Sequence, residues 1–378
     1  ASGKVGATTG SPAFSGSGTQ PSPARAGAPA ATAAGGGTGS VSVGSGGSGT
    51  GAAAPTGRAG AGVESTTAGS AGITNAGAGG IPAAGGGGSA AGAAGSTAPT
   101  AGTAGGSTDD VACNAADKGP DAMPVSGIGM GEKPTGQFAT AVEIDPGLPD
   151  ETIFRPEPLG MIKHPVLAWG NGGCSRSNSG FSEFLLQIAA EGIVVLADGP
   201  ASGSSNQDGS QLIKAIDWAE KENERPCSKY YHKLDLKAIA VSGQSCGGLM
   251  ALNTSDDKRI TTSMPMNSGL MARNAMLYAA LHAPMAIING GESDIAYANG
   301  NADFEAINNI PIMVANIPVG HGGTYRQDNG GEMGKMARAW LRWHLLKDEA
   351  ATGKGMFIGD ACGFCSGEWE MKWKMKPQ

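Results

Sequence analysis

The sequence predicts an α/β fold in which helices cover both faces of a mainly parallel central sheet. From about residue 111 to the end, short apolar runs alternate with helical runs, which is typical of such a sheet. One apolar run continues through Gly243-Gln244-Ser245-Cys246-Gly247 into a helix rich in small residues. Residues 1–110, by contrast, are almost entirely Gly, Ala, Ser, Thr and Pro. We therefore expect one folded domain, residues 111–378, behind a separate N-terminal segment.

The N-terminal segment, residues 1–110, is expected to be a disordered tether. Up to Ser107 its only charged residues are Lys4, Arg25, Arg58 and Glu64. Such a composition cannot bury enough apolar surface to offset the entropy of the chain. A glycine-rich run at 44–49 resembles a phosphate-binding loop only in its letters, because no strand precedes it and no helix follows it.

The predicted strands of the folded domain are short apolar runs that end at Gly, Pro or polar residues. In chain order they cover residues 138–144, 151–154, 166–169, 193–196, 236–241, 260–264, 285–288 and 312–317. The first two are expected to pair antiparallel around the turn Asp145-Pro146-Gly147. Between the strands, the helical spacing of apolar residues predicts helices. These helices cover residues 182–190 with Ser182 as the N-cap, 211–223, the segment after Ser245, 274–281, 302–307 and 332–346.

The C-terminal run Glu368–Lys376 alternates apolar and charged residues with a period of two, which predicts a strand with one solvated face. We favour an edge strand that covers the core, because apolar faces are usually core. An aromatic platform for a ligand is the alternative. Between the strands 260–264 and 285–288 there is room for one helix and no cap domain. A site at the strand ends is therefore expected to be open, which suits polymeric or bulky ligands.

Ser245 is the candidate nucleophile. In a G-x-S-x-G turn between a strand and a helix, the positions two before and two after the serine crowd the neighbouring backbone and favour glycine, here Gly243 and Gly247. The serine then lies at the helix N-terminus, where unpaired amides and the helix dipole stabilise a developing negative charge. An ordinary Gly-rich turn is the alternative, and the flanking strand and helix argue against it.

A serine nucleophile needs a base, and His321 is the best candidate among the five histidines. It follows the last apolar strand in the loop Val319-Gly320-His321-Gly322-Gly323, where no helical or strand period accounts for it. The others precede a strand, lie in a Tyr/Lys-rich loop or belong to helices, and we interpret them as structural: His164, His232, His282 and His344.

The base needs a carboxylate that holds the imidazole in the tautomer able to accept the serine proton. In the chain order Ser, acid, His, this carboxylate lies between Ser245 and His321. Asp294, soon after the strand 285–288, fits the position. Glu292, two residues earlier and with a longer side chain, is the rival.

From about Thr152 to Cys365 the chain resembles the α/β-hydrolase family, and within it the secreted, lidless cutinase-like polyester hydrolases and dienelactone-hydrolase-like esterases. The motifs that carry this resemblance are, in order, Thr152–Pro156, Trp169–Gly172, Gly243–Gly247, Gly291–Ala296 and Gly320-His321. A closing Trp-Leu helix and a late cysteine belong to the same pattern. Two features depart from it: Cys246 stands where Met is common, and Pro265–Gly269 lacks the aromatic residue that many members use to bind substrate.

The resemblance implies a serine esterase that acts through an acyl-enzyme, with Ser245 as nucleophile, His321 as base and Asp294 as orienting acid. No metal or organic cofactor is expected. Cys246 is the alternative nucleophile, and we set it aside because the turn exposes its central residue and directs the next side chain toward the protein. A disulfide or a packed thiol is expected for Cys246.

The same resemblance implies an oxyanion hole made by the backbone amides of Asn171 and Cys246, and substrate contacts by Asn171, Gln244 and Asn267. The expected substrate is a polyester, cutin or another bulky ester. One alternative is an acetyl or feruloyl esterase that acts on plant polysaccharide. Another is a non-catalytic adhesion or binding protein that uses the fold as a scaffold.

Six cysteines in the folded domain, an even number behind a long and sparsely charged segment, predict export and disulfides. Only Cys362 and Cys365 are close enough in sequence to suggest a pair, and a zinc site there lacks a second pair of ligands. We expect a secreted or cell-surface monomer, tethered through its N-terminal segment. No apolar run approaches the roughly 20 residues of a membrane span, and no basic stripe indicates nucleic-acid binding.

Overall fold

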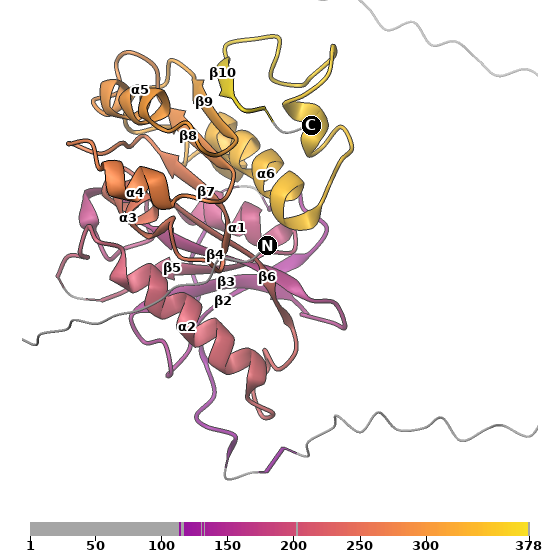
Figure 1. Ribbon diagram of the computed structural model, residues 1–378. Helices are drawn as coiled ribbons and strands as arrows, with labels where there is room; N and C mark the ends of the chain where they lie inside the picture. The colour runs from indigo at the N-terminus through magenta and orange to yellow at the C-terminus, as the bar shows by residue number, and fades with distance from the viewer. Residues whose placement is uncertain (1–112, 115–116, 130, 132, 202, 377–378) are drawn as a thin grey trace, which may run out of the picture. The chain divides into compact units, whose positions relative to one another are not determined.

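The structure is a computed structural model that describes residues 113–114, 117–129, 131, 133–201 and 203–376. The predicted tether, residues 1–110, lies outside the described residues. The strands and helices named below all belong to the expected folded domain, and their order can be followed in Figure 1.

Among the described residues, ten strands form one mixed, mostly parallel sheet in the order β1-β2-β3-β5-β4-β6-β7-β8-β9-β10. Their bounds are β1 Met123–Pro124, β2 Ala139–Ile144, β3 Glu151–Glu157, β4 His164–Gly170, β5 Val194–Asp198, β6 Leu234–Gln244, β7 Ile260–Met266, β8 Met285–Asn289, β9 Ile312–Asn316 and β10 Glu370–Lys374. The strands from β5 to β9 in this order are parallel, while β1, β2, β3 and β10 pair antiparallel with their neighbours. The predicted α/β class and mainly parallel sheet are confirmed.

Helices cover both faces of this sheet (Figure 1). Their bounds are α1 Ser182–Ala190, α2 Ser210–Glu224, α3 Cys246–Thr254, α4 Ala275–Ala280, α5 Tyr297–Ala306 and α6 Gly331–Leu346. Residues of α1 and α6 pack on one face with Leu167 and Trp169 of β4. Residues of α2 pack on the other face with Val166 and Ala168, the alternate residues of the same strand, and α4 and α5 cover β8 and β9. Because β4 is buried on both faces, its apolar run is continuous.

Two predictions about helix starts were wrong. Ser182 is the first helical residue rather than the N-cap, which is Phe181, and the Ser182 hydroxyl donates to the carbonyl oxygen of Asn178 at 3.0 Å. Helix α5 begins at Tyr297 rather than at residue 302. It contains Gly300, and a glycine inside a helix weakens the helical signal of a sequence.

The C-terminal strand was predicted correctly. Strand β10 pairs antiparallel with β9 at the edge of the sheet. Met371 and Trp373 pack against the core, while Glu370 and Lys372, which alternate with them, are exposed. The period of two in the sequence therefore corresponds to an edge strand with one solvated face.

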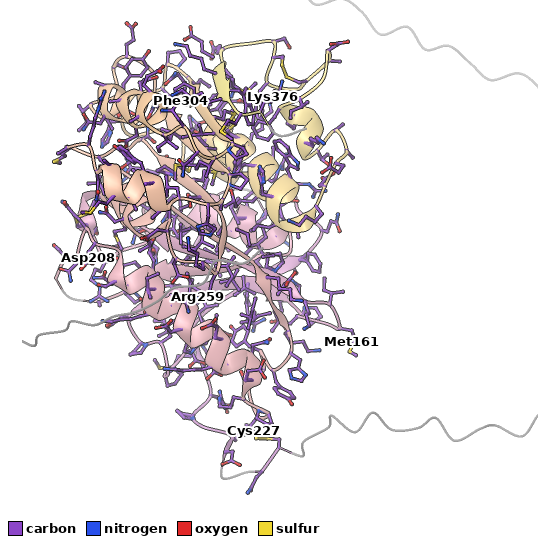
Figure 2. All side chains as sticks on the ribbon, in the orientation of Figure 1. Met161, Asp208, Cys227, Arg259, Phe304 and Lys376 are labelled. Carbon is purple, nitrogen blue, oxygen red and sulfur yellow. A yellow bond between two sulfur atoms is a disulfide. The ribbon has the colours of Figure 1, made fainter. Side chains whose placement is uncertain are left out.

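Three disulfides join described cysteines: Cys113–Cys227, Cys174–Cys246 and Cys362–Cys365. The expectation of disulfides is confirmed, both for the close pair and for Cys246. The bond at Cys227 joins the start of the domain to the loop after α2 (Figure 2). None of the helices in the described part of the chain has the length and apolar character needed to cross a membrane.

Candidate active site

Ser245 stands in a strained turn between β6 and α3. Its φ of 56° lies in the left-handed region, which a non-glycine residue adopts at an energetic cost. Glycines make the turn possible. A Cβ on Gly243 would lie 2.4 Å from the backbone of Gly247, and a Cβ on Gly247 would lie 1.9 Å from the carbonyl oxygen of Gly170. The crowding expected on both sides of Ser245 is therefore present, and Gly170 of β4 is a third glycine that the turn requires.

Three side chains from three strand ends form a continuous chain of hydrogen bonds. The Oγ of Ser245 lies 2.9 Å from Nε2 of His321, and Nδ1 of His321 lies 2.6 Å from Oδ1 of Asp294. Ser245 follows β6, Asp294 follows β8 and His321 follows β9. The parallel order of these strands brings their carboxyl ends to one edge of the sheet. Glu292, the rival acid, is exposed to solvent instead.

The carboxylate of Asp294 is fully buried and accepts four hydrogen bonds. Besides His321, its donors are the backbone amides of Gly290 (2.8 Å) and Ala296 (2.9 Å) and the side-chain amide of Asn267 (2.7 Å). Burial by itself raises the pKa of Asp294, but these donors outweigh burial and hold the pKa below its ordinary value. An ionised Asp294 keeps the proton of His321 on Nδ1, so Nε2 can accept the serine proton.

Asn267 supports this carboxylate. Its side chain is inside the protein at 0% exposure, and its Oδ1 accepts a hydrogen bond from the hydroxyl of Tyr325. Burial, and then the charge of Asp294, raise the pKa of the Tyr325 hydroxyl, so the hydroxyl remains a donor. This donor orients the Asn267 amide with its NH₂ group toward Asp294. We therefore assign Asn267 to positioning Asp294 and no longer to contacting substrate.

The loop that carries His321 is held from two sides. The amide of Gly320 donates to the carbonyl oxygen of Gly290 at 2.8 Å, and a Cβ on Gly290 would lie 2.0 Å from the carbonyl oxygen of Gly320. On the other side, Nε2 of Gln244 donates to the carbonyl oxygen of His321 at 2.8 Å. Gln244 also lines the cleft over Ser245. Of the three side chains implied to contact substrate, Gln244 is the one that lines the cleft.

Two backbone segments meet beside Ser245. Cys246 is the first residue of α3, and the N–H of a first helical residue has no acceptor within its own helix. The second segment, residues 171–174, is joined to α3 by the Cys174–Cys246 disulfide. It is joined again by a hydrogen bond of 3.0 Å from the amide of Gly247 to the carbonyl oxygen of Asn171. These links hold the two segments of the implied oxyanion hole against each other.

The buried side chain of Asn171 holds residues 171–174 in place through hydrogen bonds. It is 0% exposed, accepts from Trp169 Nε1 at 3.1 Å and donates to the carbonyl oxygens of Ser175 and Asp198. Gly172 and Gly173, the next two residues, line the cleft. The Asn171 side chain is therefore reassigned from substrate contact to loop structure, and only its backbone remains a candidate for the oxyanion hole.

A cleft of about 900 Å³ opens over Ser245 and His321. One wall comes from residues 172–181 and a second from residues 322–327, and the two segments meet where the rings of Phe181 and Tyr325 lie 5.3 Å apart. The first wall presents three exposed hydroxyl side chains, Ser175, Ser177 and Ser179. The second wall carries Arg326 and Gln327, both exposed. The lining is therefore rich in hydrogen-bonding groups.

None of the other four histidines lines the cleft. Both ring nitrogens of His164 lie 2.8 Å from backbone carbonyl oxygens, and Nε2 of His282 lies 3.1 Å from another. Burial, and then the charge of Lys347, lower the pKa of His344 to about 3. These surroundings agree with the structural interpretation of His164, His282 and His344.

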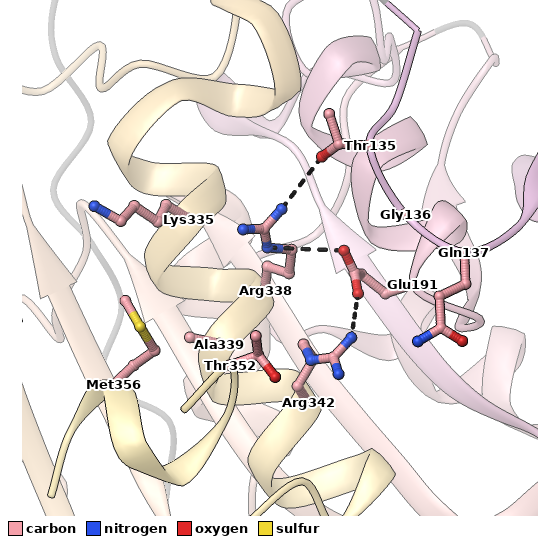
Figure 3. Close-up of a pocket in the computed structure, with 10 residues that line it drawn as sticks. All are labelled: Thr135, Gly136, Gln137, Glu191, Lys335, Arg338, Ala339, Arg342, Thr352 and Met356. Carbon is pink, nitrogen blue, oxygen red and sulfur yellow. Dashed lines mark hydrogen bonds and ion pairs between the residues drawn. The ribbon is translucent and has the colours of Figure 1, made fainter. Parts of the chain in front are cut away.

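A second cavity, of about 310 Å³, lies beside α6 and the segment around Thr135 (Figure 3). Its Glu191 forms ion pairs with Arg338 at 3.7 Å and with Arg342 at 2.6 Å, and Arg342 also pairs with Asp348 at 2.7 Å. We interpret this closed network as a structural link between the end of α1 and α6. Within the described residues, no group of three or more His, Cys, Asp or Glu side chains could hold a metal ion.

Comparison of the chain with known protein-family models finds no match, and comparison with curated protein sequences finds none. The class of the protein is therefore defined by its own structure. It is an α/β protein with a mixed, mostly parallel sheet and a hydrogen-bonded Ser-His-Asp chain at the carboxyl edge of that sheet.

Sequence reasoning missed the walls of the cleft. Ser175, Ser177 and Ser179 recur at every second residue, a period that is typical of an extended segment with one exposed face, and this signal could have indicated a wall. Tyr325 and Arg326 follow His321 closely, so attention to the residues after the base would have found them. The contact between Tyr325 and Asn267 joins distant segments, and no local pattern indicates it.

Proposed function

We propose that this chain is a serine ester hydrolase of the α/β-hydrolase class and that it works through an acyl-enzyme intermediate. The observation that supports this proposal is the hydrogen-bonded chain of Ser245, His321 and Asp294, with the serine in a strained turn at the start of α3. A structural turn has no need of a buried carboxylate aligned with a serine through a histidine, whereas acyl transfer does.

In the proposed acylation step, Oγ of Ser245 attacks the ester carbonyl carbon while Nε2 of His321 takes the hydroxyl proton. Asp294 stabilises the imidazolium without taking its proton. The carbonyl oxygen gains negative charge beside the amide of Cys246, at the positive end of α3. When the C–O bond to the alcohol breaks, the alcohol leaves with the proton from His321, and the acyl group stays on Ser245.

Deacylation repeats these roles with water as the nucleophile. His321 takes a proton from the water as its oxygen attacks the acyl carbon, and the same amides face the second oxyanion. The bond between the carbon and Oγ of Ser245 then breaks, and Oγ regains its proton from His321. The products are a carboxylic acid and the regenerated serine, and the residues of this chain supply every proton transfer.

Two substrate classes compete within this proposal. A polyester, cutin-like or otherwise bulky ester suits a site without a cap, since α4 is the single helix between β7 and β8. An acetyl or feruloyl ester on polysaccharide suits the hydroxyl and amide groups of the cleft walls, which hydrogen-bond a hydrophilic chain better than an aliphatic one. The polar lining favours the second class.

We also propose that the domain acts outside the cell, as a monomer, on a tether formed by residues 1–110. The three disulfides support an oxidising compartment, because such bonds persist there and are rare in a reducing cytosol.

Hydrolysis of 4-nitrophenyl acetate tests the proposal. The full chain is expected to release nitrophenolate, with an initial burst of about one equivalent if deacylation is the slower step. Ser245→Ala is expected to abolish both the burst and turnover, while Ser366→Ala, at an exposed serine outside the cleft, leaves them unchanged. A folded protein with neither burst nor turnover would favour the binding-protein alternative.

A further inference from the structure

We propose that the cleft accepts esters carried on hydroxyl-rich, carboxylate-bearing chains, such as acidic polysaccharides, and that Arg326 recognises the carboxylate of the chain. This inference rests on the proposed function and names the substrate class of the same site. It is carried by the lining of the cleft and by the unusual position of one guanidinium group.

The first observation is the polarity of the two walls. Ser175, Ser177 and Ser179 line one wall of the cleft, and Gln327 and Gln244 also line it. Ser177 donates to Oγ of Ser179 at 3.2 Å and Nε2 of Gln244 donates to the carbonyl oxygen of His321, so the donors left for a ligand are the hydroxyls of Ser175 and Ser179 and the amide of Gln327. A polymer of methylene and ester units would leave these donors without partners, which costs free energy when water is displaced. A sugar chain offers hydroxyl partners along its whole length. The walls are therefore complementary to a hydrophilic chain.

The second observation is that Arg326 is an unpaired cation. Of the seven other arginines that the structure describes, six form ion pairs with carboxylates within 4.0 Å: Arg155, Arg176, Arg225, Arg259, Arg338 and Arg342. The seventh, Arg273, is exposed and does not line the cleft. No carboxylate among the described residues lies that close to Arg326, although the chain has a net charge of -7. Arg326 is thus an exposed guanidinium that keeps its full charge available for a ligand.

The third observation is where this guanidinium lies. A Cβ on Gly180, in the wall of residues 172–181, would be 3.4 Å from Nη2 of Arg326. The Arg326 guanidinium therefore lies beside Gly180 of the wall of residues 172–181, and both residues line the cleft. Arg326 lines the same cleft as Ser245, and its planar fork matches a carboxylate with two parallel hydrogen bonds.

Among the described residues that line the cleft, Arg326 is also the one whose side chain carries a permanent charge. The ionised Asp294 is buried behind His321 and does not line the cleft. A ligand carboxylate in the cleft thus meets a cation and neutral donors, and none of the lining residues that the structure describes has a carboxylate that would repel it. A neutral polyester has no carboxylate with which Arg326 could form an ion pair.

A matched pair of small esters tests this inference: 4-acetoxybenzoate, which carries a carboxylate, and 4-acetoxybenzamide, which is neutral and similar in shape. The measured quantity is the ratio of kcat/KM for the anion to kcat/KM for the amide. Intrinsic differences between the two leaving groups cancel when this ratio is compared between wild type and variant. Arg326→Gln is expected to lower the ratio roughly two- to fivefold at low salt, as for an exposed ion pair.

Two controls sharpen the test. Lys163→Gln also removes one exposed positive charge, but Lys163 precedes β4 at the amino ends of the parallel strands, so the ratio is expected to stay at its wild-type value. Added salt is expected to lower the wild-type ratio toward that of Arg326→Gln, because salt screens exposed charges. Unchanged circular dichroism and thermal unfolding would show that both variants are folded.

Acetylated polygalacturonate and its carboxyl-amidated form extend the comparison to a polymer.

The outcomes separate the two proposals. An equal ratio in wild type and Arg326→Gln, or an equal drop in Lys163→Gln, overturns the role of Arg326 while ester hydrolysis itself stands. A wild-type protein that hydrolyses neither ester and does not react with a fluorophosphonate overturns the proposed function, and the inference with it. A lower ratio in Arg326→Gln alone, removed by salt, supports the inference.

Discussion

At the residue scale, the proposed chemistry depends on which carboxylate orients His321. Asp294 is buried, accepts from four donors and lies 2.6 Å from Nδ1 of the histidine, whereas Glu292 is exposed. Asp294→Asn is expected to lower kcat by about 10³–10⁴, because the imidazole would take the wrong tautomer. Glu292→Gln is the matched control, and its kcat is expected to stay close to wild type.

Steady-state kinetics of the two variants on one soluble ester, with circular dichroism to show that both are folded, provide the check. A larger loss in Glu292→Gln than in Asp294→Asn would mean that the loop rearranges in the working enzyme so that Glu292 takes the orienting role.

At the element scale, the Cys174–Cys246 disulfide fastens the loop after β4 to the start of α3. Replacing both cysteines with Ala keeps the amide of Cys246 but frees the loop, so kcat is expected to fall while KM changes less. The free energy of unfolding is expected to drop by roughly 2–4 kcal/mol, because the bond closes a long loop of chain. The double Ala variant of Cys362 and Cys365 is the control, since it leaves the cleft untouched. Equal kcat values in the two double variants would contradict a positioning role for the first bond.

A second prediction at this scale concerns Glu151 of β3, which is 3% exposed and lies opposite Asp198 of β5. Burial, and then the charges of Asp198 and Asp150, raise the pKa of Glu151 from 4.5 to about 8. Folded protein therefore keeps a proton that unfolded protein loses above about pH 4.5. The contribution of Glu151 to stability falls as pH rises from that value to about 8.

Glu151→Gln places a side chain that is neutral at every pH at this position, so the variant is expected to lack the loss of stability that wild type shows as pH rises to about 8. Its free energy of unfolding at pH 8 should exceed that of wild type by an amount on the order of a few kcal/mol, while the two proteins have similar stability at pH 4. Urea unfolding at several pH values measures the free energy of unfolding of wild type and Glu151→Gln. Glu224→Gln, at an exposed position, is the control. A variant that is no more stable than wild type at pH 8 would show that Glu151 is ionised in the folded protein.

The sequence predicted elements best where burial leaves a clear periodic pattern. Strand β4, buried on both faces, appears as the run Val166–Trp169, and the alternation in Glu370–Lys374 predicted the edge strand β10. Prediction from the sequence failed at helix starts such as Tyr297. There the turn that precedes α5 sets the boundary, and Gly300 obscures the helical spacing of apolar residues. Local pattern is a weak guide wherever tertiary contacts decide the end of an element.

At the scale of the whole molecule, the order of strands decides which residues meet. The sequence placed Ser245, Asp294 and His321 after separate strands, and the neighbouring parallel strands β6 to β9 bring those ends together. The cleft walls could not be predicted in the same way. Residues 172–181 follow β4 and residues 322–327 come after β9, and they line one cleft because the sheet brings the ends of β4, β6 and β9 to the same edge.

The N-terminal segment is predicted to be dispensable for chemistry, because its composition gives it little apolar surface to pack into a site. Removal of residues 1–110 is expected to leave kcat and KM for a small soluble ester within about twofold of the full chain. Parallel kinetics on the two proteins measure this. A large loss of kcat would show that the segment contributes to the site.

Covalent labelling tests the nucleophile. The full chain is treated with a fluorophosphonate, digested and analysed by mass spectrometry to locate the modified residue. Modification of Ser245 is expected, and it should disappear in Ser245→Ala and become much slower in His321→Ala, because the serine loses its base. A folded protein that takes up no label, or takes it up at a residue other than Ser245, would contradict a serine hydrolase with this catalytic chain.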